Sequence, residues 1–176
     1  MTPLPPPVRL TGLPDPVAAR AALRVIFFQS TSRTAFADED ERERFFVTWT
    51  GWYLDNAPRD VWFLPDGGGG YAGYLTGCRD SAAVDGPGRV IPKYGVFADL
   101  FAAFPAHLHI NLAPDARGLG LGRRLIDAFA ADCISDGLAG MHVVTGVGAR
   151  NAAFYTRAGF IHAVERGPLL FLGRPL

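Results

Sequence analysis

Two kinds of hydrophobic pattern occur along the chain, one with the period of a helix and one with the period of a strand. Helical spacing or a capping residue marks four segments: 18–29, 38–55, 121–135 and 150–158. Apolar or alternating runs typical of strands occupy 8–10, 61–64, 71–78, 107–112, 141–145, 160–164 and 169–172. Residues 81–105 form a long irregular connection with a short helix near 96–103. The order of these segments predicts one α/β domain over residues 1–176, with no internal boundary.

Composition places the chain among compact globular proteins. It has 176 residues, of which 49% are hydrophobic and 19% charged, and this excludes a disordered chain. Seventeen basic and seventeen acidic residues cancel, so we expect no nucleic acid and no membrane as partners. Cys78 and Cys133 are too few for a disulfide framework or a four-cysteine zinc site, which favours a cytoplasmic location. Residues 1–7 lack a signal-peptide pattern, and no apolar stretch approaches the ~20 residues of a membrane helix.

The most informative stretch lies between the strand at 107–112 and the helix at 121–135. It reads Arg117-Gly118-Leu119-Gly120-Leu121-Gly122, followed by Arg123 and Arg124. Glycines let the backbone turn tightly and leave its N–H groups uncovered, and a helix N-terminus follows directly. Together these features are typical of a cradle for a pyrophosphate, to which the arginines would add charge-assisted contacts.

Two common nucleotide motifs do not fit this stretch. A dinucleotide-binding fingerprint needs a third glycine where Arg123 stands, and an acidic residue that the strand at 141–145 does not carry. A P-loop needs Gly-Lys-Ser/Thr, which is absent from the sequence. The pattern that remains is Arg-x-x-Gly-x-Gly between a strand and a helix.

That pattern resembles motif A of the GCN5-related N-acetyltransferases, whose ligand is acetyl-CoA. The stretch 151–160, with Phe154-Tyr155 followed by Gly159-Phe160, is similar to motif B of the same family at a family-like separation. More narrowly, the stretch 104–112 resembles bacterial relatives of the acetyltransferase-like C-terminal domain of O-GlcNAcase. The resemblance implies a mixed, mostly antiparallel twisted sheet with helices on both faces. It also implies a V-shaped cofactor cleft between the strands at 107–113 and 141–145.

The resemblance also implies roles for individual residues. The backbone of Leu112 and Ala113 would contact pantetheine, and Tyr155 would protonate the departing CoA thiolate. The pyrophosphate loop would consist of Arg117, Gly118, Leu119, Gly120, Leu121, Gly122 and Arg123, and Asn151 and Phe154 would complete the cofactor site. This sequence departs from the family at Gly148, where an asparagine is common. Asn151, one helical turn before Tyr155, is the alternative source of that amide.

The expected activity is acetyl transfer from acetyl-CoA to an unidentified amine acceptor by direct attack in a ternary complex. His109, His107 or a water chain is the candidate base, and the alternative is that both histidines are packed residues of a sheet face. A non-catalytic module that binds CoA or an acylated partner is the second class of function. Polyamines, amino sugars and protein amines stay open as acceptors, and so does a homodimer.

Other groups of residues carry weaker expectations. His142 and His162 have no second ligand at suitable spacing, so no metal site is expected. Residues 38–44 are expected to form a solvated helix face with charge pairs four residues apart. The aromatic residues of segment 81–105 predict a wall on the acceptor side of the cleft that orders when ligand binds.

Overall fold

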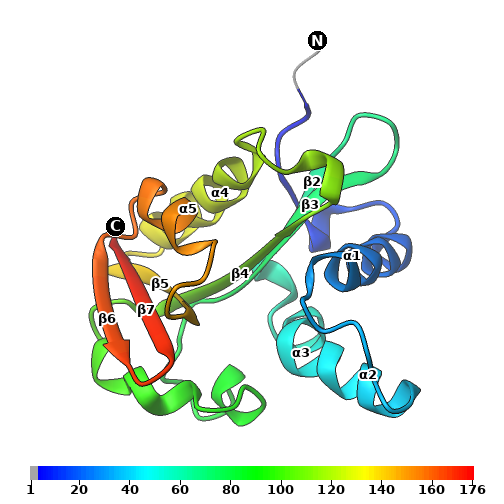
Figure 1. Cartoon of the computed structure of the whole chain (residues 1–176). Coiled ribbons are helices and arrows are strands. Elements are labelled where there is room, and N and C mark those ends of the chain that lie inside the picture. The colour runs from blue at the N-terminus through cyan, green and yellow to red at the C-terminus, as the bar shows by residue number, and fades with distance from the viewer. Residues whose placement is uncertain (1–3) are drawn as a thin grey trace. The chain divides into compact units, whose positions relative to one another are not determined.

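The computed structural model describes residues 4–176, and within them the predicted helices and strands are present (Figure 1). The α-helices are α1 (Pro16–Ser30), α2 (Glu39–Phe46), α3 (Trp52–Asn56), α4 (Leu121–Ser135) and α5 (Ala152–Arg157). The strands are β1 (Val8–Arg9), β2 (Val61–Pro65), β3 (Tyr71–Cys78), β4 (Ala106–Leu112), β5 (Gly140–Gly146), β6 (His162–Arg166) and β7 (Leu169–Pro175). The expectation about residues 1–7 includes 1–3, which lie outside the described residues.

The strands form a seven-stranded sheet in the order β1-β2-β3-β4-β5-β7-β6. Strands β4 and β5 run parallel, with Ala106 opposite Met141 and His107 opposite His142. The pairs β1–β2, β2–β3, β5–β7 and β6–β7 are antiparallel. The fold is therefore a mixed α/β fold with an open, mostly antiparallel sheet, which confirms the predicted fold class.

Contacts divide the described chain into two compact units. Unit 1 comprises residues 4–77 and 109–128, and unit 2 comprises 78–108 and 129–176. Each unit has its own buried aromatic residues. In unit 1, Phe27 of α1 lies edge-on to Phe46 of α2, with 5.4 Å between the ring centroids.

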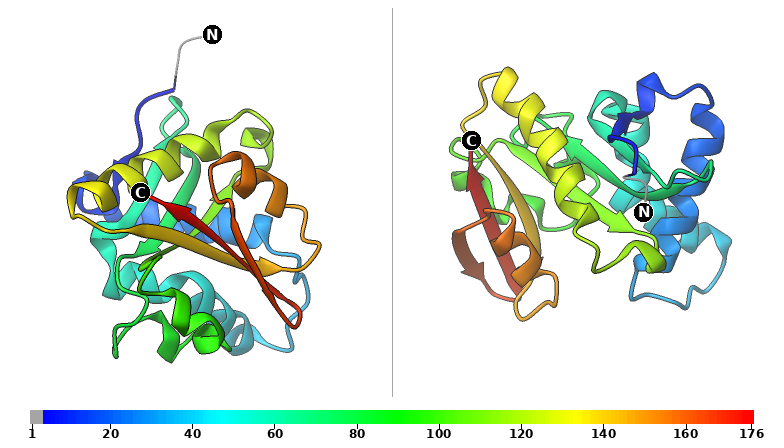
Figure 2. Two further views of the ribbon diagram at one scale, coloured as in Figure 1. Left: turned by 90° about the vertical axis from the view of Figure 1, so that its left-hand side faces the viewer. Right: turned by 90° about the horizontal axis from the view of Figure 1, so that it is seen from above.

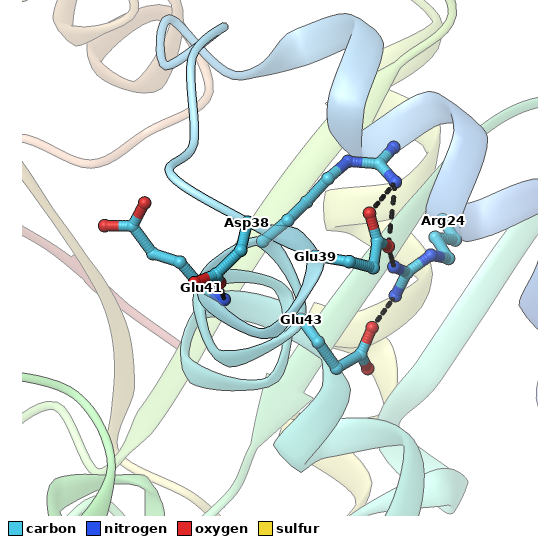
Figure 3. Close-up of polar contacts among 6 residues, drawn as sticks. Arg24, Asp38, Glu39, Glu41 and Glu43 are labelled. Atoms are coloured by element: carbon cyan, nitrogen blue, oxygen red, sulfur yellow. Dashed lines mark hydrogen bonds and ion pairs between the residues drawn. The ribbon is translucent and has the colours of Figure 1, made fainter.

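Capping residues fix where α1 and α2 begin. Asp15 accepts a hydrogen bond from the Ala18 amide, and Asp38 accepts one from the Glu41 amide. The exposed face of α2 is a charge network (Figure 3): Arg24 of α1 contacts Glu39 and Glu43. These side chains are largely solvated, as predicted. The pairing differs from the prediction, because the partner of Glu39 within α2 is Arg42, three residues away instead of four.

The predicted helix at 38–55 is interrupted by a π-helical turn at Val47–Gly51, so that α2 and α3 are separate elements. A Cβ atom at Gly51 would lie 3.3 Å from Cγ2 of Val47 and 3.4 Å from the ring of Phe46, so glycine permits this close turn. π-turns widen a helix locally and are frequent at functional sites. Here the turn carries Trp49 and Thr50.

Segment 81–105 is part of the core of unit 2. Phe97, Phe101 and Phe104 are buried and pack with Phe171 of β7. The predicted short helix is a 3-10 helix at Tyr94–Leu100, and β6 begins at 162 instead of 160. Figure 2 shows β7 paired with both β5 and β6 in this unit. The expected wall that orders around a ligand is therefore corrected: three of its aromatic side chains are core residues.

Candidate functional site

The glycine loop lies in unit 1, between β4 and α4. Gly118 and Gly120 adopt positive φ angles of 76° and 74°, which L side chains rarely adopt, and a Cβ atom at either position would meet nothing within 4 Å. The Arg123 amide, after the loop, donates to the Gly120 carbonyl at 3.2 Å. The first amides of a 15-residue helix follow, and the first turn of a helix has N–H groups without a partner inside it. The loop therefore offers open space beside a site that favours an anion.

The other members of the loop differ from these two glycines. Gly122 is buried in the first turn of α4, and Leu119 is 63% exposed. Leu121 begins α4 and is half-buried. The open backbone that the sequence predicted is thus concentrated at Gly118 and Gly120.

The arginines around the loop contact other parts of the protein. Arg117 donates to the Leu112 carbonyl at 3.1 Å, and to the Gln29 carbonyl at 3.1 Å. Arg123 pairs with Asp127 at 2.8 Å. Arg124 donates to the backbone carbonyls of residues 4 and 5 at 3.0 and 2.8 Å. A phosphate contact from these side chains would therefore share each guanidinium with its present partners or replace them.

Leu112 and Ala113, expected to contact pantetheine, end β4 beside β3. The Ala113 amide donates to the Ala72 carbonyl at 3.0 Å, and the Ala113 carbonyl accepts from the Ala116 amide at 3.0 Å. Gly73 makes this approach feasible, because a Cβ atom there would lie 2.4 Å from Cδ2 of Leu112. Several backbone groups of the predicted contact are therefore already used within the protein.

A pocket of about 320 Å³ lies in unit 1, between α1, α2, the π-turn and β4. Its lining consists of Phe27, Thr31, Ser32, Phe45, Trp49 and Asn111. The sequence analysis did not find this pocket. The sequence feature that could have indicated the pocket is the pair of short polar residues Thr31 and Ser32, which follows α1 and lies between two helices rich in aromatic residues.

A second pocket of unit 1, of about 580 Å³, lies beside four other residues of α1 and the residues that follow β4. Its lining is mostly aliphatic and consists of Ala22, Val25, Ile26, Gln29, Tyr71, Ala113, Pro114 and Asp115. Burial, with a contribution from Asp15, raises the pKa of Tyr71. At neutral pH its phenol therefore keeps its proton.

His109 lies among aromatic rings of unit 1. Its ring centroid is 6.2 Å from that of Trp49 and 5.5 Å from that of Tyr53. Burial lowers the pKa of His109 to about 4, so the imidazole is neutral at pH 7. His107 belongs to unit 2, where its ring stacks on His142 at 4.9 Å. These surroundings favour the interpretation of both histidines as packed residues of a sheet face.

Tyr155 lies on α5 in unit 2 and is 6% exposed. Its ring contacts Phe154 and Phe160, with centroids 5.2 and 5.6 Å away. Burial raises the pKa of Tyr155, so the side chain is a neutral phenol that carries a proton at pH 7. Asn151, directly before α5, accepts a hydrogen bond from Thr145 of β5 at 2.9 Å through Oδ1.

Two negative findings apply to residues 4–176. Within them no group of three histidine, cysteine, aspartate or glutamate side chains could hold a metal ion. No helix of this part of the chain is long and apolar enough to cross a membrane.

Comparison with known proteins identifies the family. A family model described as an acetyltransferase (GNAT) domain matches residues 66–162, which is more than half of the 176 residues. This range contains β4, the glycine loop, α4, β5 and α5. The chain belongs to the GNAT acetyltransferase family.

Solved structures agree with this assignment. The crystal structure of a protein named SsHAT has 29% sequence identity and a TM-score of 0.73, and the match covers 97% of this chain and 98% of that one. PH1933 from Pyrococcus horikoshii OT3 has 14% identity and a TM-score of 0.69, over 97% of both chains. Naa20 from Chaetomium thermophilum, solved with a bisubstrate analogue, has 18% identity and a TM-score of 0.58, over 97% and 86%. The last two similarities support the fold alone.

Proposed function

We propose that the protein transfers an acetyl group from acetyl-CoA to a primary amine by direct attack in a ternary complex. The observation that carries the proposal is the loop at Gly118 and Gly120, whose positive φ angles and open surroundings fit a pyrophosphate at the start of α4. Membership of the GNAT family supports acetyl-CoA as the ligand of this loop. The residues assigned to it are those from Arg117 to Arg123, with Leu112, Ala113, Asn151 and Phe154 as further cofactor contacts.

The reaction requires one bond to form and one to break. The amine nitrogen attacks the acetyl carbonyl carbon, the carbon–sulfur bond breaks, the nitrogen loses one proton and the CoA sulfur gains one. Backbone N–H groups that polarise the carbonyl and hold the thioester in place contribute most to such a reaction. We assign the proton for sulfur to Tyr155 because the stretch 151–160 resembles motif B of the family, and its phenol carries a proton at neutral pH.

The base that takes the proton from the amine is the less specific part of the proposal. His109 is neutral at pH 7 and can accept a proton, but a pKa of about 4 means that it holds the proton weakly. An imidazole of this kind would pass the proton on to water. We therefore propose that a water chain acts as the base, and that His109 is the side chain that takes part in it. Carboxylates are absent from the lining of the pocket beside β4.

The narrower resemblance to bacterial relatives of the O-GlcNAcase domain stays a prediction, as do a cytoplasmic location and a homodimer. The second proposed function, suggested by that resemblance, is a non-catalytic module that binds CoA. The two functions differ in one measurement, the release of CoA thiol from acetyl-CoA in the presence and absence of a panel of amines. Release that depends on an amine supports transfer. Binding of acetyl-CoA without such release contradicts it and supports the binding module.

A further inference from the structure

The pocket of about 320 Å³ in unit 1 has an unusual lining for a site that accepts an amine. Three of its six lining residues, Phe27, Phe45 and Trp49, are aromatic. The other three, Thr31, Ser32 and Asn111, carry short uncharged polar groups. The lining thus combines aromatic faces with hydrogen-bonding groups, and it contains no carboxylate.

A charged pair lies beside Phe45 of this lining. The guanidinium of Arg33 lies over the ring of Phe45, 5.5 Å from its centroid. Arg33 is paired with Glu41 at 2.5 Å, and a hydrogen bond from the Ala37 amide together with this contact lowers the pKa of Glu41. The pair therefore adds no net negative charge beside Phe45 that would attract a molecule with several ammonium groups.

Asn111 connects this pocket with the segment assigned to acetyl-CoA. It immediately precedes Leu112 and Ala113 on β4. Its Nδ2 donates to the hydroxyl of Tyr74 at 2.8 Å, and Tyr74 is fully buried, so the amide is held in one orientation. This bond uses one of the two N–H groups of Nδ2, and Oδ1 is an acceptor of the kind that an amine N–H requires.

The pocket has room for one ring with a short chain, because an apolar cavity of roughly 150 Å³ already holds one benzene molecule and this pocket measures about 320 Å³. An aromatic lining also stabilises an ammonium group through cation–π attraction, with tryptophan the strongest partner. Sugars carry many hydroxyls, each of which needs a hydrogen-bond partner, and polyamines need several carboxylates.

We infer that this pocket binds the body of the acceptor, and that the acceptor class is a primary amine joined by a short alkyl chain to a single aromatic ring. The inference rests on the proposed acetyl transfer. The products would be the N-acetylated amine and CoA thiol, with the proton balance described above.

The first experiment uses the wild-type protein. CoA release from acetyl-CoA is measured with 2-phenylethylamine, spermidine, glucosamine and a lysine-containing peptide, each against acetyl-CoA alone. We expect kcat/KM for 2-phenylethylamine to exceed the other values at least tenfold. A preference for one of the other acceptors leaves acetyl transfer standing and overturns this inference.

The second experiment compares two identical substitutions in one aromatic cluster. Phe45→Leu removes a ring from the pocket lining and keeps an apolar side chain of similar size. Phe36→Leu is the matched control, because Phe36 packs on Phe45 at 5.4 Å but is not a lining residue. We expect kcat/KM for 2-phenylethylamine to fall at least tenfold in Phe45→Leu and less than twofold in Phe36→Leu. Equal losses in both would overturn the assignment of the pocket.

A failure of the proposed function is distinguishable from a failure of this inference. If no amine in the panel releases CoA, acetyl transfer to these amines is contradicted. Isothermal titration of 2-phenylethylamine into CoA-saturated protein then decides the pocket. Saturable binding that Phe45→Leu weakens at least tenfold supports the pocket and its ligand class, and the absence of binding to wild type overturns both.

Discussion

The guanidinium of Arg117 donates to the backbone carbonyl of Gln29 at 3.1 Å, across 88 residues of sequence. Gln29 lies in the last turn of α1, and Arg117 also donates to the hydroxyl of Ser30 at 3.2 Å. A cation at the C-terminal end of a helix satisfies carbonyls that have no partner within the helix. The residue that opens the glycine loop thus holds that loop against the end of α1, within unit 1.

Arg117 acts in this structure through the shape of its guanidinium, which reaches three acceptors. A lysine keeps the charge but lacks the planar fork that reaches two or more acceptors at once. We therefore expect Arg117→Lys and Arg117→Gln to weaken acetyl-CoA binding by the same factor, roughly three- to tenfold, as measured by isothermal titration. Wild-type affinity in the lysine variant alone would show that Arg117 acts as a positive charge on the phosphates.

Tyr155→Phe removes one oxygen from a buried side chain and little packing area. Positioned acid catalysis is typically worth ~10²–10⁴-fold, and water can replace part of it. We expect the single-turnover rate to fall at least about tenfold, while the melting temperature and acetyl-CoA affinity stay close to wild type. Because burial raises the pKa of Tyr155, loss of its proton should not reduce the wild-type rate below about pH 10. A normal single-turnover rate in the variant would make Tyr155 a packing residue.

His109 should make the stability of the fold depend on pH. Burial lowers its pKa from 6.5 to about 4, so between these values the unfolded chain binds a proton that the folded chain does not. Stability therefore falls as pH drops through 6.5, and from pH 7 to pH 5 this residue accounts for a loss of roughly 2 kcal/mol. Urea denaturation at both pH values should show that loss reduced in His109→Gln. The same pH dependence in both proteins would mean that burial does not shift the pKa of His109.

Gly73 sets how closely β3 approaches the end of β4. A Cβ atom there would lie 2.4 Å from Cδ2 of Leu112 and 2.7 Å from the backbone oxygen of Asn111. Gly73→Ala should therefore lower the free energy of unfolding by roughly 1–3 kcal/mol, the usual range for overpacking. Gly95→Ala is the control, because a Cβ atom at Gly95 meets nothing within 4 Å. Urea denaturation of both variants tests the prediction, and equal stabilities would show that the two strands separate easily.

Local patterns in the sequence were sufficient for the helices, the strands and the glycine loop, and the family resemblance implied the mostly antiparallel sheet. Periodicity located the strands and helices, and two glycines before a helix indicated a tight, open turn. It could not show the π-turn at Val47–Gly51 or the pocket beside Trp49, since these depend on how α1 and α2 pack. His107 and His109 are two residues apart on one strand, yet their aromatic neighbours differ. Only the tertiary structure separates them.

The arginines illustrate the same limit. Their position beside the glycines predicted phosphate contacts, and the sequence contains no sign that the Gln29 carbonyl would be a partner of Arg117. The Arg123–Asp127 pair differs, because the two residues are four apart on one helix and such spacing is readable from sequence. Hydrogen bonds between distant segments follow from packing, which periodicity does not encode. The phosphate contacts of Arg117 and Arg123 therefore stay predictions.

Isothermal titration of acetyl-CoA into wild type, Gly120→Glu and Gly137→Glu tests the central claim most directly. Gly120 and Gly137 have nearly the same φ, 74° and 72°, with open space around each, so both substitutions impose similar backbone strain. Gly120 precedes α4, whereas Gly137 follows its end. We predict that wild type and Gly137→Glu bind acetyl-CoA with similar affinity, and that Gly120→Glu loses at least about 100-fold, because its carboxylate blocks and repels the pyrophosphate. Equal affinity in Gly120→Glu and wild type would contradict the assignment of this loop.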